Sequence, residues 1–214
     1  MTADTALYIL AGLPVTIALT GLALLFGAVV GFPLMLAAQS AFTPLRLLTV
    51  GVISFVRSVP PILWLFLIFF GLGSGVVTLS AFSAAVVAFG LIAAVNMAEI
   101  YRGGMVAIHH GQYEAAIALN FSTYRLYRDI LIPQMVRVSI PSAATYAIGL
   151  MKDSAIASTI GVAELAFRGN QISLQTYRGL EVYAVVGLLY ILLSLPVAAL
   201  SREAERHLRA KVSR

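Results

Sequence analysis

The chain has 214 residues, of which 60% are hydrophobic and 11% charged, and its mean hydropathy is +0.95. Soluble domains carry about 25% charged residues, so this composition indicates an integral membrane protein with a single domain over residues 1–214. The formal net charge is +5, but the basic residues lie in the segments that flank the hydrophobic runs. No basic face lies elsewhere, which argues against a nucleic-acid partner. The lack of cysteine excludes disulfides, thiolate metal ligands and a cysteine nucleophile.

Five hydrophobic runs are long enough for transmembrane helices, since a bilayer core needs about 20 apolar residues per helix. In chain order, the runs cover residues 7–38, 47–71, 79–100, 135–157 and 181–200. The second run is broken by Arg57 and Pro60-Pro61, and a glycine-rich link follows it. We therefore expect an all-α membrane protein with one long polar segment, residues 101–134, between its third and fourth spans.

The positive charges indicate the orientation, because cytoplasmic segments are enriched in Lys and Arg. With the N-terminus outside, the outer segments hold Arg168 and Arg178, and Lys152 lies in or near a span. The inner segments then hold the other 11 basic residues: Arg46, Arg57, Arg102, Arg125, Arg128, Arg137, Arg202, Arg206, Arg209, Lys211 and Arg214. This bias predicts an external N-terminus, a cytoplasmic C-terminus and a cytoplasmic polar segment.

The polar segment is predicted to fold as a helix–turn–helix. Residues 112–119 are good helix formers, and Asn120 tolerates the left-handed conformation on which helices commonly end. Ser122 can cap a second short helix over residues 123–131, and Pro133 then redirects the chain into the fourth span.

Such an element suits docking, because Ala115 and Ala116 are small enough to let another surface approach closely. On spacing alone, however, a surface loop that merely anchors the protein to the membrane explains the pattern equally well. The choice between these two interpretations depends on the flanking residues.

The polar segment and its flanks resemble the EAA loop of ABC importer permeases, in the branch that takes up polar amino acids. The loop motif is Glu114-Ala115-Ala116, with Asn120 where the family usually has Gly. The resemblance covers about residues 10–200, with Ser58-Val59 in place of Gly-Thr and Ala155 in place of a polar residue. The matching stretches are residues 98–104 (AEIYRGG), 110–114 (HGQYE), Pro133-Gln134, 152–155 (KDSA), Glu164-Leu165, 55–61 (FVRSVPP) and Gly71-Leu72.

The resemblance implies the type I ABC importer permease fold with a cytoplasmic coupling helix, in a bacterial inner membrane. It implies a polar amino-acid substrate, an extracytoplasmic solute-binding protein, a second permease copy (identical or paralogous) and a pair of ATP-binding subunits. No P-loop is present in the sequence, so ATP and Mg belong to those subunits and this chain carries no cofactor. The residues implied in ATPase coupling are Glu114, Ala115, Ala116, Asn120, Arg125, Arg128 and Pro133.

Polar groups inside the predicted spans are candidates for the substrate path. They are Glu99, Lys152, Asp153 and, less strongly, Asn96. A charge costs about 2.5–3.5 kcal/mol at the centre of a membrane helix, so it normally faces a cavity or a partner. These groups could line the path of a zwitterion, or they could fix helix packing through pairs such as Glu99 with Arg102. Lys152 and Asp153 diverge by about 100° on a helix, so at most one points straight at a substrate.

Other function classes fit the sequence less well. A stand-alone secondary carrier usually shows internal repeats, and an intramembrane enzyme needs a nucleophile or a metal constellation; the sequence shows neither. His109 and His110 are adjacent and lack a carboxylate at ligand spacing, so we expect no metal site. A quaternary ammonium osmolyte remains the alternative substrate, although the sequence shows no clear aromatic cage for it.

Overall fold

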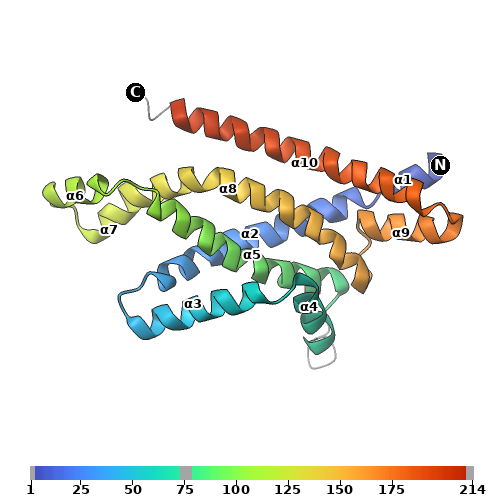
Figure 1. The fold of residues 1–214 in the computed structure, drawn as a ribbon, viewed down its shortest axis with the longest axis horizontal. Helices are drawn as coiled ribbons and strands as arrows, with labels where there is room; N and C mark the ends of the chain where they lie inside the picture. Colours follow the sequence, from blue (N-terminus) through green and yellow to red (C-terminus); the bar gives the residue numbers. More distant parts are fainter. Residues whose placement is uncertain (1–2, 73–78, 211–214) are drawn as a thin grey trace.

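The computed structural model describes residues 3–72 and 79–210, and these residues form an all-helical bundle (Figure 1). The α-helices are α1 Ala3–Leu10, α2 Leu13–Ala38, α3 Thr43–Ser58, α4 Pro61–Phe66, α5 Ala81–Val106, α6 Gly111–Ala118, α7 Thr123–Arg125, α8 Ile132–Asp153, α9 Leu165–Thr176 and α10 Gly179–Ala210. Two π-helices, η1 Leu67–Leu72 and η2 Leu126–Leu131, and one 3₁₀ helix, η3 Ser154–Ile160, extend α4, α7 and α8.

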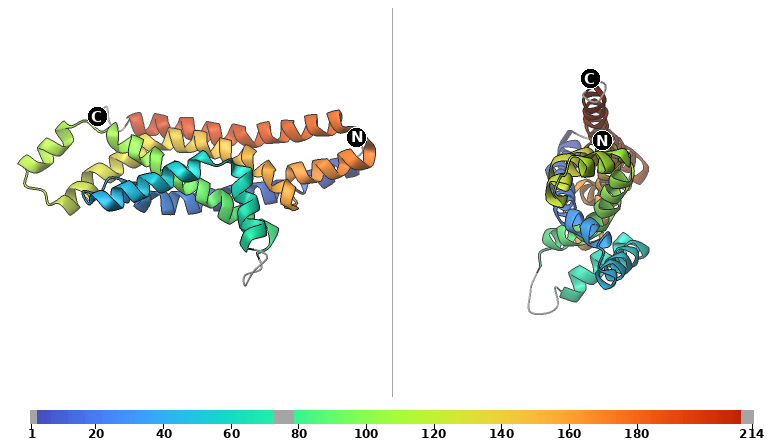
Figure 2. Two further views of the ribbon diagram at one scale, coloured as in Figure 1. Left: turned by 60° about the horizontal axis from the view of Figure 1, so that its bottom comes forward. Right: turned by 90° about the vertical axis from the view of Figure 1, so that its left-hand side faces the viewer.

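The bundle is elongated, and its two ends differ (Figures 1 and 2). The short helices α6 and α7 lie at one end, together with the C-terminal end of α10. The N-terminus, α1 and α9 lie at the opposite end. Helices α2, α5 and α8 run between the two ends, and α10 lies along their side.

Glycines let α2 and α5 approach each other closely. A Cβ on Gly27 would collide with Ala93, and a Cβ on Gly31 would lie 2.8 Å from the carbonyl oxygen of Ala94. This G-x-x-x-G spacing with alanines opposite is typical of helix pairs in lipid, where close van der Waals packing replaces the hydrophobic effect. The α2–α5 pair is therefore the spine against which the other helices pack.

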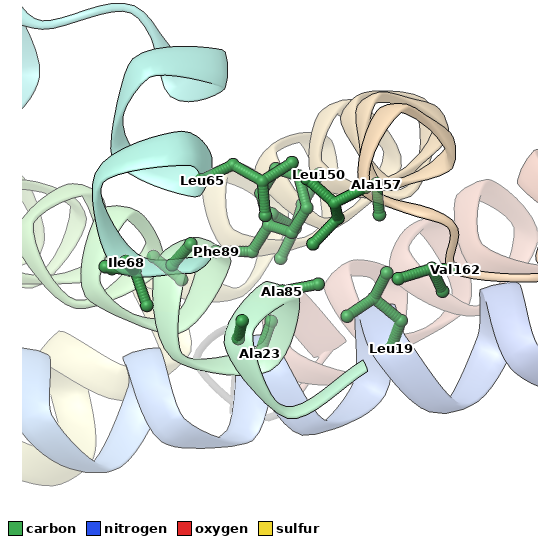
Figure 3. Close-up of a cluster of buried hydrophobic side chains, with 13 residues drawn as sticks. Leu19, Ala23, Leu65, Ile68, Ala85, Phe89, Leu150, Ala157 and Val162 are labelled. Atoms are coloured by element: carbon green, nitrogen blue, oxygen red, sulfur yellow. The ribbon is translucent and has the colours of Figure 1, made fainter. Parts of the chain in front are cut away.

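The main core lies where α2 and α5 meet α4 and the junction of α8 with η3 (Figure 3). Phe89 of α5 is the largest buried side chain there. Leu19 from α2, Leu65 from α4 and Leu150 from α8 pack in the same cluster. This core joins α2, α4, α5 and α8 with η3.

The second predicted span is a bent pair of helices. Helices α3 and α4 meet at an angle of 100°. Pro60 has no N–H to bond the carbonyl of Val56 four residues earlier, which opens the helix. The indole N–H of Trp64 donates to that carbonyl instead, at 3.0 Å. The side chain of Trp64 therefore satisfies the group that the proline leaves without a backbone donor.

Helices occupy all the predicted spans, but their bounds and character differ from the predictions. In the described residues, three segments are long and apolar enough to cross a membrane by themselves: Ala3–Ala38, Ala81–Val106 and Gly179–Ala204. The bent pair α3–α4 counts as a fourth if it is one span. Helix α8 with η3 does not meet that test, so the number of five spans and their orientation stay predictions. Helix α9 was not predicted. Part of the glycine-rich link after the second run falls in residues 73–78, outside the described residues.

Candidate functional site: the coupling loop and a polar cleft

The loop between α5 and α8 has the predicted helix–turn–helix form. Asn120 follows α6 with φ at 56°. The N–H of Asn120 donates to the carbonyl of Ile117 at 2.9 Å, and the N–H of Phe121 donates to that of Ala116 at 3.0 Å. These two bonds form a Schellman motif, which requires the left-handed residue. The predicted left-handed cap at Asn120 is confirmed.

The second half of the loop also begins as predicted. The hydroxyl of Ser122 accepts a hydrogen bond from the N–H of Arg125 at 3.4 Å. The guanidinium groups of Arg125 and Arg128 are exposed and lie over the rings of Phe121 and Tyr124. Both arginines are therefore held against the loop's own aromatic side chains.

Pro133 does not break the helix, and the prediction that it redirects the chain was wrong. Helix η2 passes directly into α8, and Pro133 lies in the first turn of α8. The N–H of Ile132 donates to the carbonyl of Tyr127, five residues earlier, in the wide turn of a π-helix. A wide turn and a first-turn position both accommodate a residue without an N–H.

The EAA motif presents two of its three residues to solvent. Glu114 and Ala115 are exposed on α6, whereas Ala116 is 1% exposed. The expectation that Ala116 offers a surface for close approach is therefore corrected, because its side chain packs inside the chain. The exposed apolar residues next to the motif are Ile117 and Leu119, which the motif-based reading missed.

A pair of glutamines braces α6 against α8. The amide of Gln134 donates to the side-chain oxygen of Gln112 at 3.2 Å and to the carbonyl of Ile130 at 3.0 Å. The brace therefore links α6 directly to the first turn of α8. Gln112 and Gln134 both belong to stretches that match the family pattern, but their pairing could not be read from the sequence.

A polar cleft of about 500 Å³ opens between α3, α5 and α8. Asn96 and Glu99 of α5 line it together with Arg57, the penultimate residue of α3. The carboxylate of Glu99 pairs with Arg102 at 2.8 Å, as predicted for a helix i,i+3 pair, and lies 3.9 Å from Arg57. The bend between α3 and α4 thus places Arg57 beside two of the predicted path residues.

Helix α8 provides the opposite wall through Ser142 and Tyr146. The hydroxyl of Tyr146 is buried and has no hydrogen-bond partner among the described residues. Asp153 lies seven residues, about two helical turns, beyond Tyr146 on the same face of α8. It is not among the residues that line this cleft.

Lys152 faces a different region. It lines a second cleft, of about 490 Å³, between α8 and α10, with Ala155, Tyr190 and Ser194. The adjacent pair therefore divides between two faces, in keeping with the 100° turn between neighbouring helical residues. Of the predicted path residues, Asn96 and Glu99 come together in one cleft. Asp153 lies further along α8, and Lys152 lines the other cleft.

Sequence reasoning missed the role of Glu164, which is 0% exposed. Its carboxylate caps α9 by accepting the N–H groups of Ala166 at 2.9 Å and Phe167 at 2.7 Å. It also accepts the hydroxyl proton of Tyr190 on α10. Beside it, the N–H of Leu165 donates to the hydroxyl of Thr16 on α2. The sequence analysis had no signal for this cap, because it did not predict α9 and because the burial of a carboxylate is not visible in the sequence.

Comparison with known proteins gives consistent results. The model of the family described as "Binding-protein-dependent transport system inner membrane component" matches residues 23–210. The arginine transport system permease protein ArtQ of Bacillus subtilis (strain 168) is 33% identical over 204 residues, covering 95% of this chain and 93% of ArtQ. The L-cystine transport system permease protein TcyL of the same organism is 31% identical over 209 residues, covering 94% and 87% of the two chains.

A solved structure agrees with the sequence matches. A chain in the crystal structure of an amino acid ABC transporter with histidines superposes with a TM-score of 0.89 at 31% identity, over 97% of this chain and 100% of that one. The family match, the matches to the relatives and the structural superposition each cover most of the chain. The chain therefore belongs to the inner-membrane components of binding-protein-dependent transport systems, the permeases of ABC importers.

Proposed function

We propose that this permease carries a polar amino acid along the cleft between α3, α5 and α8. The observation that carries the proposal is the meeting of both charge signs in one cleft, where Arg57 lies beside Glu99. Asp153 adds a negative charge about two helical turns beyond Tyr146 on α8. An amino acid bears one carboxylate and one ammonium group, and each needs a partner once water is removed. The buried hydroxyl of Tyr146 offers a further hydrogen bond. Relatives named for arginine and for L-cystine transport support this substrate class.

The remaining parts of the transporter are separate chains in this proposal. The exposed face of α6, with Glu114, Ala115, Ile117 and Leu119, docks an ATP-binding subunit, which holds ATP and Mg. The Gln112–Gln134 brace passes the movement of α6 to α8, a wall of the cleft. Two ATP-binding subunits serve two permease copies, and an extracytoplasmic binding protein supplies the amino acid.

The test is uptake by proteoliposomes that contain the permease, its ATP-binding subunit and its binding protein. We expect Glu99→Gln and Asp153→Asn each to lower kcat/KM for transport roughly tenfold, about 1.4 kcal/mol. Lys152→Met should have a smaller effect, because Lys152 faces the other cleft. Thr145→Val is the matched control on α8, since its hydroxyl bonds to its own helix at Pro141.

Two outcomes would contradict the proposal. If Glu99→Gln and Asp153→Asn complexes assemble and transport at unchanged rate and KM, the cleft is not the path. If the vesicles accumulate a quaternary ammonium solute and no amino acid, the substrate class is wrong.

A further inference from the structure

The turn between α9 and α10 presents apolar side chains that nothing in the described chain covers. Tyr177 is 94% exposed and Leu180 is 90% exposed, and Leu174 in the last turn of α9 is also exposed. The turn lies at the end of the bundle opposite α6 (Figure 1). We call Leu174, Tyr177 and Leu180 the apolar tip.

The backbone of the tip is well defined. The N–H of Tyr177 donates to the carbonyl of Ser173 at 2.9 Å, and Arg178 pairs with Glu181 at 2.8 Å. Tyr177 has φ at 56°, a conformation that bulky residues rarely adopt and that Gly or Asn adopts more easily. A strained residue persists where something else favours it, and no contact within the described chain does so for this ring.

The charges of α10 mark where the tip lies relative to a bilayer. Residues 182–201 contain no charged side chain, and Glu181 and Arg202 flank them. At 1.5 Å per residue the stretch is about 30 Å long, the thickness of a bilayer core. Almost none of this span is buried within the chain. Its end at Glu181 therefore coincides with the hydrocarbon boundary, and the tip is continuous with the lipid-facing surface of α10.

We propose that the apolar tip inserts into the membrane boundary at the end of the bundle remote from α6 and fixes the depth of the α9–α10 hairpin. Leu174 and Leu180 reach the acyl chains. The ring of Tyr177 lies at the level of the headgroups, where aromatic side chains with a polar end are enriched. The Arg178–Glu181 pair stays in the headgroup layer, where its charges are solvated.

Site-directed spin labelling tests the depth of the tip directly. The chain has no cysteine, so Tyr177→Cys, Leu180→Cys and Leu119→Cys each accept one nitroxide. Leu119 is the control, because it is exposed at the opposite end, in the coupling loop. In proteoliposomes of the permease without its ATP-binding subunits, where Leu119 faces water, we expect labels at 177 and 180 to collide severalfold more with oxygen, relative to a water-soluble nickel chelate, than the label at 119.

A second measurement separates the tyrosine ring from the backbone of the turn. Tyr177→Gly relieves the left-handed strain and keeps the fold, so a label at 180 should become more accessible to the nickel chelate if the ring is an anchor. Labels at 177 and 180 that are as open to the chelate as the label at 119 would overturn the proposal. Labels that are shielded only after the binding protein or a second permease copy is added would assign the tip to that protein instead.

Discussion

Both ends of the bundle carry a short helix that closes on a left-handed residue other than glycine, but the two ends are held in opposite ways. Asn120 follows α6 and Tyr177 follows α9, and both residues have φ at 56°. Helix α9 is anchored by the buried carboxylate of Glu164, whose partners include Tyr190 of α10. Helix α6 is held by the inward packing of Ala116 and by an exposed pair of glutamines, Gln112 and Gln134.

The difference bears on the proposal that α6 docks an ATP-binding subunit. A helix held by a buried charged group cannot shift without leaving that group unsatisfied, which is costly. A helix held by a buried alanine and an exposed amide pair leaves no charged group unsatisfied when it shifts, so its shift costs less. The α9 end is therefore a fixed frame, and the α6 end is suited to following the movement of a partner.

The largest loss of stability is expected from removing the buried carboxylate of Glu164. Glu164→Ala should lower the free energy of unfolding by about 3 kcal/mol, because it removes a helix cap and leaves the hydroxyl of Tyr190 unpaired. The melting temperature of the detergent-solubilised protein measures the loss. Glu181→Ala is the control at the same end, and its exposed ion pair should be worth under about 1 kcal/mol. If both variants lose the same stability, the buried carboxylate of Glu164 does not hold α9 in place.

The next comparison lies within the EAA motif. Ala116→Asp should destabilise the coupling loop by about 2 kcal/mol, since it places a carboxylate where the side chain is buried. Ala115→Asp should leave the melting temperature unchanged and weaken co-purification with the ATP-binding subunit, since Ala115 is exposed. If Ala115→Asp and Ala116→Asp melt at the same temperature, the inward packing of Ala116 is wrong.

The two left-handed residues can be compared by the same substitutions. Asn120→Gly should be tolerated, whereas Asn120→Val should cost about 1–2 kcal/mol because a β-branched residue is strained at positive φ. Tyr177→Gly should raise stability in detergent by about 1 kcal/mol, where the ring has no bilayer to meet. Thermal melts of the four proteins, including the parent, give the values. Indistinguishable melts for Asn120→Val and Asn120→Gly would exclude a left-handed cap in solution.

The smallest change in stability is expected at the glutamine brace. Gln134→Leu should cost about 0.5–1.5 kcal/mol, the value of an ordinary hydrogen bond. Its main effect should be on coupling, seen as more ATP hydrolysed for each amino acid imported. Gln112→Leu is the matched variant, and the double variant should add little to either single one because the two side chains share one bond. If the two substitutions have fully additive effects on the ATP hydrolysed for each amino acid imported, the two glutamines do not act through their shared hydrogen bond.

Local chemistry made the coupling loop predictable. The cap at Asn120 and the cap at Ser122 follow from residue type and position in the turn, and the structure contains both. The ion pair of Glu99 with Arg102 likewise follows from i,i+3 spacing. Each of these features involves residues only a few positions apart, so the sequence shows them directly.

Long-range features were not predictable in the same way. The sequence could not show that Arg57 lies beside Glu99, because this contact depends on the bend at Pro60 and on how α3 packs against α5. The inward position of Ala116 depends on how α6 rests on the rest of the loop. The cap at Glu164 joins residues from α2, α9 and α10, and no periodic pattern reveals such a junction.

The indole of Trp64, which donates to the carbonyl of Val56 across the α3–α4 bend, gives the permease a built-in optical reporter. It is the single tryptophan of the chain, so the long-wavelength fluorescence of the isolated permease arises from this bend. Straightening the bend would break the indole hydrogen bond and change the environment of the ring. A shift in emission during the transport cycle would therefore record the motion of the helix that carries Arg57, without any added label.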